Sequence, residues 1–158
     1  MSRRLLRGAV LAAGALALAS QVRADAPGDQ YLPFTRSDKT IVDQQTGLDW
    51  ERGDPAVAWP TVDSLAAANS RCVGQTRRVP TLKELLTLVD ELPTKEYEKG
   101  QEIPKYIDTA AFPKTPVGAF YTSTGTGGAA EVYCVDFGTG DATPCSTATK
   151  NAYVRCVK

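Results

Sequence analysis

The residues of this chain that could carry chemistry are acids, serines and cysteines, because none of its 158 residues is a histidine. Without histidine there is no Ser-His or Cys-His pair to activate a nucleophile, and the commonest metal ligand is missing. No Ser-x-x-Lys motif is present either. Asp108, Asp136 and Asp141 could form a glycosidase-type carboxylate pair by residue type alone. We expect them to be turn and strand-end residues, and we predict that the protein is not an enzyme.

Cofactor and metal sites are not predicted. Gly125-x-Gly127-Gly128 suggests a phosphate loop, but no Gly-Lys-Ser/Thr and no helical pattern follows it, so we interpret it as a strand connection. The acid spacing of an EF-hand loop is also absent. We therefore expect no cofactor and no metal.

The N-terminal segment has the pattern of a signal peptide. Early arginines precede an apolar run from Gly8 to Ala19, which is shorter than the roughly 20 residues of a membrane-spanning helix. Small-residue cleavage sites end at Ala19 and at Ala24, and we prefer Ala24. The sequence thus predicts a signal peptide at 1–24, no membrane span, and export to the periplasm or the extracellular space, where an even number of cysteines usually forms disulfides.

The four cysteines allow three pairings. If Thr139-Gly140 is a two-residue turn, Cys134 faces Cys145 across a hairpin, and Cys72 is left to pair with Cys156. A four-thiolate zinc site is the alternative. Zinc sites use close Cys-x₂₋₄-Cys pairs, whereas at least ten residues separate successive cysteines here, so we predict two disulfides.

The charge balance limits the partners. The chain has 18 basic and 18 acidic residues, and loss of residues 1–24 removes four arginines and no acid, which leaves a net charge of −4. No run of five basic residues occurs. Nucleic acid and anionic membrane surfaces are therefore poor candidate partners.

Short patterns predict the elements that position these residues. Thr61 is the expected N-cap of a helix that ends before Gly74, with Cys72 on its buried face. A capping box at Thr81-x-x-Glu84 begins a second helix, which ends before Pro93. Strands are expected at 40–43, 48–51, 120–124, 132–137 and 152–157, the last with Ala152, Val154 and Cys156 on one face.

The remaining segments are expected to be irregular or to lie in the core. Residues 25–39 form a polar lead-in, and residues 91–118 contain four prolines. Within them, Thr94–Lys105 is a charged stretch that we interpret as a functional or mobile loop. Trp50 and Trp59 are expected to be core residues.

Six short segments follow one another between Ile41 and Val157: Val42-Asp43-x-x-Thr46-Gly47-Leu48-x-Trp50, Arg78-Val79-Pro80-Thr81-x-x-Glu84-Leu85, Ile107-Asp108-x-x-Ala111-Phe112-Pro113, Tyr121-x-Ser123-Thr124, Val135-Asp136-Phe137-x-x-Gly140 and Tyr153-Val154-Arg155-Cys156-Val157. This series resembles the Lcl-type C-terminal domain, a family of exported bacterial domains of formerly unknown function. The resemblance covers residues 40–158. Two departures are Arg77, where the family usually has Trp, and a longer segment at 91–106.

The resemblance implies an α+β fold of the C-type-lectin-like superfamily. Two helices would pack on a curved, mostly antiparallel sheet with two disulfides and neighbouring chain ends. Since the family includes adhesins that bind sulfated polysaccharides, it also implies a binding module for a glycan or cell-surface polymer. The calcium-and-sugar triplets of true C-type lectins are absent, so calcium-dependent binding is not implied. The net charge of −4 argues against strong polyanion binding here.

The candidate ligand-binding residues lie in or beside loops, where tyrosines can stack on a sugar or anchor a partner. They are Tyr97, Tyr106, Asp108, Tyr121, Thr122, Ser123, Thr124 and Asp136. The alternative is a protein–protein or structural module of the cell envelope that contacts an envelope or extracellular protein through Thr94–Lys105. The sequence leaves the ligand and the oligomeric state open.

Overall fold

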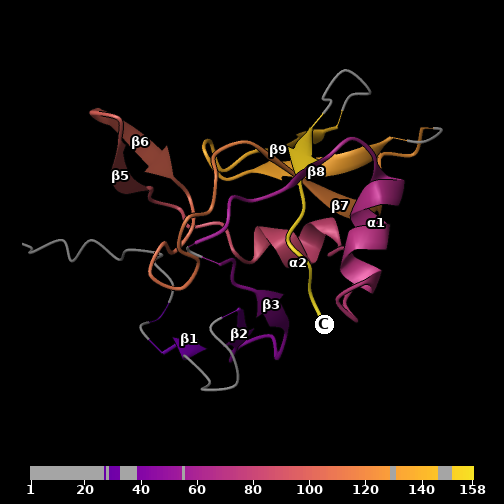
Figure 1. Cartoon of the computed structure of the whole chain (residues 1–158), viewed down its shortest axis with the longest axis horizontal. Coiled ribbons are helices and arrows are strands. Elements are labelled where there is room, and N and C mark those ends of the chain that lie inside the picture. The colour runs from indigo at the N-terminus through magenta and orange to yellow at the C-terminus, as the bar shows by residue number, and fades with distance from the viewer. Residues whose placement is uncertain (1–26, 28, 33–38, 55, 129–130, 146–150) are drawn as a thin grey trace, which may run out of the picture.

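The computed structural model describes residues 27, 29–32, 39–54, 56–128, 131–145 and 151–158 (Figure 1). The predicted signal peptide and its cleavage site lie outside these residues. Within the described residues, three sheets and two helices make an α+β structure, as predicted.

The largest sheet has the strand order β4-β10-β7-β8-β9. Its strands are β4 (Thr61–Val62), β7 (Ala119–Gly125), β8 (Val132–Asp136), β9 (Ala142–Pro144) and β10 (Ala152–Tyr153). β10 pairs with β7 in parallel, and the other pairings among the described strands are antiparallel. A smaller sheet contains β1 (Tyr31–Leu32), β2 (Thr40–Asp43) and β3 (Asp49–Glu51). β1 therefore pairs a piece of the expected lead-in with the domain.

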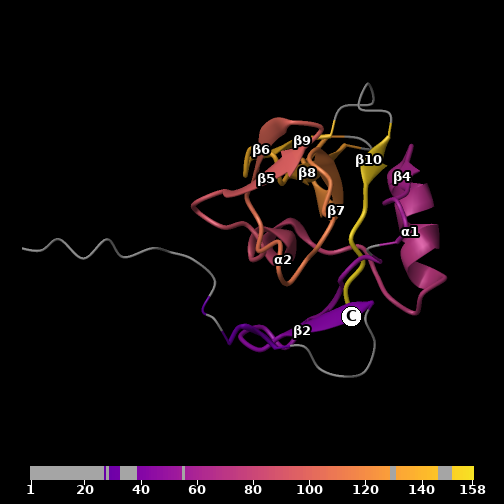
Figure 2. The same cartoon turned by 60° about the vertical axis from the view of Figure 1, so that its left-hand side comes forward.

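Helix α2 (Leu82–Leu86) lies between the two sheets in both views, and α1 (Leu65–Val73) lies beside β4 at the edge of the large sheet (Figures 1 and 2). The capping box of α2 is confirmed, because Thr81 Oγ1 accepts from the Glu84 amide and Glu84 accepts from the Thr81 amide. The helix is short because the chain turns away after it, and the Asp90 amide donates to the Tyr106 carbonyl.

The predicted start of the first helix was wrong. Its N-cap is Ser64, whose hydroxyl accepts from the Ala67 amide, and not Thr61. Thr61 and Val62 are extended instead, because they pair with Tyr153 and Ala152 of β10. The long-range sheet pairing prevails over the local preference of threonine for a helix cap.

The C-terminal segment runs between two hydrophobic clusters, and its residues alternate between them. Ala152, Val154 and Cys156 belong to one cluster, as the predicted shared face requires. Tyr153 and Val157 pack in the other, which also contains Trp50 with no exposed surface. The last residue, Lys158, exchanges two backbone hydrogen bonds with Asp49 in β3. The end of the domain therefore lies beside its beginning, as the resemblance implied.

Both predicted disulfides are present. Cys72 joins Cys156 with a Cα–Cα distance of 5.4 Å, and Cys134 joins Cys145 with 5.3 Å. The register used to predict the second bridge was wrong by two residues, however. Cys134 lies opposite Thr143, because residues 137–140 form a four-residue loop between Asp136 and Asp141, closed by a hydrogen bond from the Gly140 amide to the Asp136 carbonyl. The bridge therefore runs diagonally across the hairpin.

The charged stretch from Thr94 to Lys105 is a β-hairpin, which corrects the prediction of an irregular loop. β5 (Thr94–Glu98) pairs with β6 (Gln101–Lys105), and the hairpin projects from the body of the molecule (Figure 1). Lys99 and Gly100 both have positive φ, 52° and 81°. A two-residue turn of this kind matches the twist of the strands that it joins.

Candidate functional site

A surface groove of about 470 Å³ lies between loops that are far apart in sequence. Residues 56–59 form one side and residues 114–117 the other, and Tyr153 of β10 and Glu98 of β5 complete the lining. Five lining residues are apolar without being aromatic: Ala56, Val57, Ala58, Pro116 and Val117. Val57 and Val117 are exposed. The groove is thus lined by both apolar and polar groups.

Two aromatic side chains of the groove are anchored on the core. Trp59 meets Phe120 edge to face, with ring centroids 5.7 Å apart, and Tyr153 meets the same ring at 5.2 Å. Gly53 packs against the Trp59 ring from another side. It has φ of +90°, and a Cβ at that position would lie 2.8 Å from Trp59 Cζ2. The groove wall is therefore held in place by packing.

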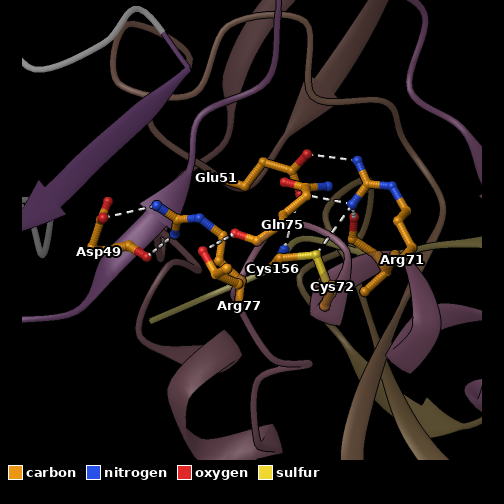
Figure 3. Close-up of a disulfide and its surroundings, with 9 residues drawn as sticks. Asp49, Glu51, Arg71, Cys72, Gln75, Arg77 and Cys156 are labelled. Atoms are coloured by element: carbon orange, nitrogen blue, oxygen red, sulfur yellow. Dashed lines mark hydrogen bonds and ion pairs between the residues drawn. A yellow bond between two sulfur atoms is a disulfide. The ribbon is translucent and has the colours of Figure 1, made fainter.

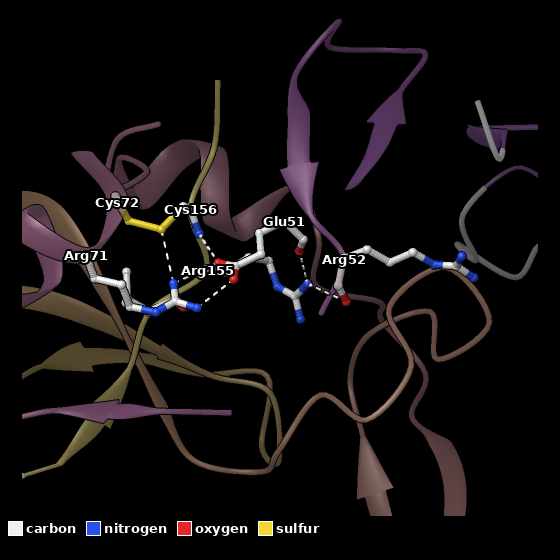
Figure 4. A network of polar contacts seen from close by, with 7 residues as sticks. Glu51, Arg52, Arg71, Cys72, Arg155 and Cys156 are labelled. Carbon is white, nitrogen blue, oxygen red and sulfur yellow. Dashed lines mark hydrogen bonds and ion pairs between the residues drawn. A yellow bond between two sulfur atoms is a disulfide. The ribbon is translucent and has the colours of Figure 1, made fainter. Parts of the chain in front are cut away.

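Arg155 is completely buried, and its guanidinium points at the main chain of Glu51 and Arg52 (Figure 4). Its guanidinium lies between the rings of Trp59 and Phe112, 4.5 and 4.6 Å from their centroids. Its Nη2 donates to Thr115 Oγ1 at 2.7 Å, and Nη1 donates to the carbonyl of Glu51. Burial lowers the pKa of Arg155 to about 9, against the opposing effect of Glu51, so the side chain is protonated at neutral pH. The cation–π contact with Trp59 and the hydrogen bond to Thr115 tie both groove loops to the C-terminal segment that follows β10.

Two charges lie at the edges of the groove. Glu98 comes from the hairpin, and its Oε1 accepts from Lys105 Nζ at 3.0 Å. Lys114 lies on the opposite loop in the left-handed backbone region, with φ of 58°. Among the residues that the structure describes, Lys114 has no ion pair. A carboxylate that accepts and an ammonium that donates are thus both available to a ligand.

A second cavity of about 360 Å³ shares Val57 with the groove but contains Glu51 and Asp54. Glu51 is not a free acid, because it binds Arg71 through two hydrogen bonds of 2.6 and 2.9 Å beside the Cys72–Cys156 disulfide (Figure 3). Burial raises the pKa of Glu51, but the hydrogen bonds from Arg71 and the Cys156 amide lower it by more. The pKa of Glu51 is therefore below its usual value. Glu51 therefore holds β3 against α1 and the C-terminal segment around Cys156.

Most of the predicted ligand residues serve the protein's own backbone. Tyr121 is 5 % exposed, and the buried Thr122 donates to the Tyr133 carbonyl. Ser123 Oγ donates to the Pro80 carbonyl, and Thr124 Oγ1 accepts from the Leu82 amide. The contacts of Ser123 and Thr124 fasten β7 to the start of α2, and the contact of Thr122 joins β7 to β8.

The two predicted aspartates behave as turn and strand-end residues. Asp108 Oδ1 accepts from the amides of Ala110 and Ala111. Asp136 Oδ1 accepts from the amides of Gly118 and Gly138. Each carboxylate therefore closes a connection next to the large sheet.

The two remaining predicted residues lie apart. Tyr97 is 75 % exposed on the outer face of the hairpin and donates to Glu102 Oε2, whereas Tyr106 packs over Gly140. None of the eight predicted residues lines the groove. Sequence reasoning overlooked Glu98, Lys114 and Tyr153 as groove residues and placed Trp59 in the core. One signal was available, since the alternation of Ala152 and Val154 places Tyr153 on the opposite face of the segment.

The described ranges contain no helix that is long and apolar enough to cross a membrane. They also contain no group of three or more side chains arranged to hold a metal ion. The two disulfides are consistent with an exported protein.

Comparison with known proteins identifies one family. Neither a curated protein nor a solved structure matches the chain. The family model of the Lcl C-terminal domain matches residues 39–158, which include the second helix, both disulfides and every residue of the groove. The match covers most of the chain and begins within one residue of the boundary expected from the sequence. The chain therefore belongs to the Lcl C-terminal domain family.

Proposed function

We propose that this protein is an exported, non-catalytic module that binds a glycan or cell-surface polymer without calcium, on a scaffold of the C-type-lectin-like superfamily. The groove carries this proposal. Trp59 and Tyr153 offer aromatic surface for the C–H faces of sugar rings, and Glu98 and Lys114 offer hydrogen bonds to hydroxyl groups. Family membership and the two disulfides support export.

The acids support a binding role over a catalytic one. A glycosidase needs two carboxylates that face each other across the substrate. Glu51 is paired with Arg71, and Asp108 and Asp136 accept backbone amides. Glu98 lines the groove without a second carboxylate among its described lining residues. This arrangement suits recognition of hydroxyl groups.

A groove-blocking variant tests the proposal. Val117 is 40 % exposed on the groove wall, so Val117→Trp would fill the groove without removing a core contact. The matched control is Tyr97→Ala, which removes an exposed aromatic ring outside the groove. On an oligosaccharide array we expect binding by the native protein and by Tyr97→Ala, and loss of binding by Val117→Trp. Binding that survives Val117→Trp, or that disappears with Tyr97→Ala alone, would refute a groove site.

A second candidate function is a protein–protein module of the cell envelope, and the outer face of the hairpin favours it. Lys95, Tyr97 and Glu102 share that face, and Tyr97 is the most exposed of the large hydrophobic side chains in the described residues. In this case Tyr97→Ala abolishes assembly or partner binding and leaves the groove intact. Molar mass measured by light scattering, with and without the substitution, separates the two functions.

A further inference from the structure

We propose that Glu98 makes the groove select uncharged saccharides over sulfated ones. This inference rests on the proposed function and adds a specificity-determining residue to it. It also gives the β5–β6 hairpin a role, since the hairpin brings this carboxylate to a groove that is otherwise built from distant loops.

The hairpin register decides which acids face the groove. Glu98 lies on the same face as Glu96 and Lys105, whereas Glu102 lies opposite Tyr97 on the other face. Lys105 is 2 % exposed and binds both acids of its face, at 2.6 Å to Glu96 Oε2 and 3.0 Å to Glu98 Oε1. The buried ammonium therefore holds the Glu98 carboxylate at the edge of the groove.

The cluster keeps a net negative charge. Lys105 supplies one positive charge against two carboxylates, and the Glu98 side chain is 52 % exposed. Glu98 Oε2 accepts no hydrogen bond within the described part of the chain. It is thus an acceptor with a negative charge that faces whatever enters this end of the groove.

Hydrogen-bond chemistry then separates the two classes of saccharide. An ionised carboxylate only accepts hydrogen bonds, and so does a sulfate ester, so the two cannot bond to each other. A sugar hydroxyl can donate to Glu98 and accept from Lys114. An uncharged saccharide can form hydrogen bonds with both Glu98 and Lys114. A sulfated one can pair with Lys114, but its sulfate is repelled by the Glu98 carboxylate and leaves it without a hydrogen-bond donor.

The experiment compares two acids of the same hairpin. Glu98→Gln removes the groove charge and keeps an acceptor, and the control Glu102→Gln removes a charge from the outer face. The probes are uncharged oligosaccharides, each paired with its sulfated counterpart. We expect Glu98→Gln to raise the affinity for the sulfated member relative to the uncharged one by about fivefold at low salt, with a smaller change at high salt. For Glu102→Gln we expect less than about a twofold change.

The outcomes are distinguishable. If the native protein prefers sulfated probes, or if the two variants give the same ratio, the inference is overturned while saccharide binding in the groove stands. If no pair binds, or if binding survives Val117→Trp, the proposed function fails and the inference with it. Thermal unfolding of both variants identifies any loss of folding, and Glu98→Ala then provides a second neutral substitution at the same position.

Discussion

The guanidinium carbon of Arg155 lies 4.5 Å from the centre of the Trp59 ring, and the Arg155 side chain has no exposed surface. A buried arginine normally pairs with a carboxylate, but here the direct partners are three aromatic rings, main-chain carbonyls and a threonine hydroxyl. Arg155 thereby connects the loop before β4, the loop before β7 and the C-terminal segment. These are the parts of the chain that meet at the groove.

Arg155→Lys should destabilise the fold by about 3 kcal/mol, because lysine cannot span the Trp59 and Phe112 rings and leaves Thr115 and the carbonyls without their donors. The control is Arg78→Lys, which alters an exposed arginine paired with Glu84 and should change stability by less than about 1 kcal/mol. Urea unfolding of both variants measures the difference. Equal effects would mean that the buried guanidinium has no special role.

Gly53→Ala should displace Trp59, because a methyl group at this position lies 2.8 Å from the indole and the backbone has φ of +90°. We expect a loss of about 2–3 kcal/mol and a change in Trp59 fluorescence, measured in a Trp50→Phe background. Gly47→Ala is the matched control, with φ of +72° and no atom within 4 Å. It should lose only about 1 kcal/mol and leave the emission unchanged.

The two disulfides should contribute unequally. Replacing both members of Cys72–Cys156 by alanine opens a loop with a sequence separation of 84, whereas Cys134–Cys145 closes one of 11. The loop-entropy model predicts losses of about 4.5 and about 3 kcal/mol. Denaturant unfolding of the two double variants provides the comparison. The reverse order would show that native packing, and not loop closure, sets the contribution of each bridge.

The ion pair at the start of α2 should make stability depend on pH. Hydrogen bonds from Arg78, the largest cause, and from Thr81 together lower the pKa of Glu84 from 4.5 to about 2. Because the folded pKa is depressed, this contribution is present above pH 4.5 and disappears as the pH falls towards 2. Solvent screens the pair, so we expect about 1 kcal/mol in place of the full linkage value.

Glu84→Gln tests this dependence. The variant should be less stable than the native protein at pH 7 and nearly equal to it at pH 2, as measured by urea unfolding at each pH. Glu102→Gln, on the exposed outer face of the hairpin, should show a smaller difference at pH 7. A constant gap between Glu84→Gln and the native protein across this range would contradict the assigned pKa.

Local patterns in the sequence determined some parts of this protein. The capping box at Thr81 and Glu84 needs only four neighbouring residues, and α2 begins there as predicted. The alternation of Ala152, Val154 and Cys156 placed one face of the last segment in the core. Four cysteines left three pairings, and the predicted one is present although the turn used to choose it was wrong. These features could be predicted because each depends on residues close in sequence or on a small number of alternatives.

Only the tertiary structure decided the rest. Thr61 forms a strand because β10 provides its hydrogen-bond partners. No local pattern indicates a strand partner about ninety residues away. The β8–β9 register depended on the length of a turn. The hairpin at 94–105 was not predicted, because its many charged residues are not typical of a strand. The groove depends even more on contacts between residues that are far apart in the sequence. It brings Trp59, Glu98, Lys114 and Tyr153 together, with Arg155 buried behind them, and a single sequence does not reveal which distant side chains will pack against one another.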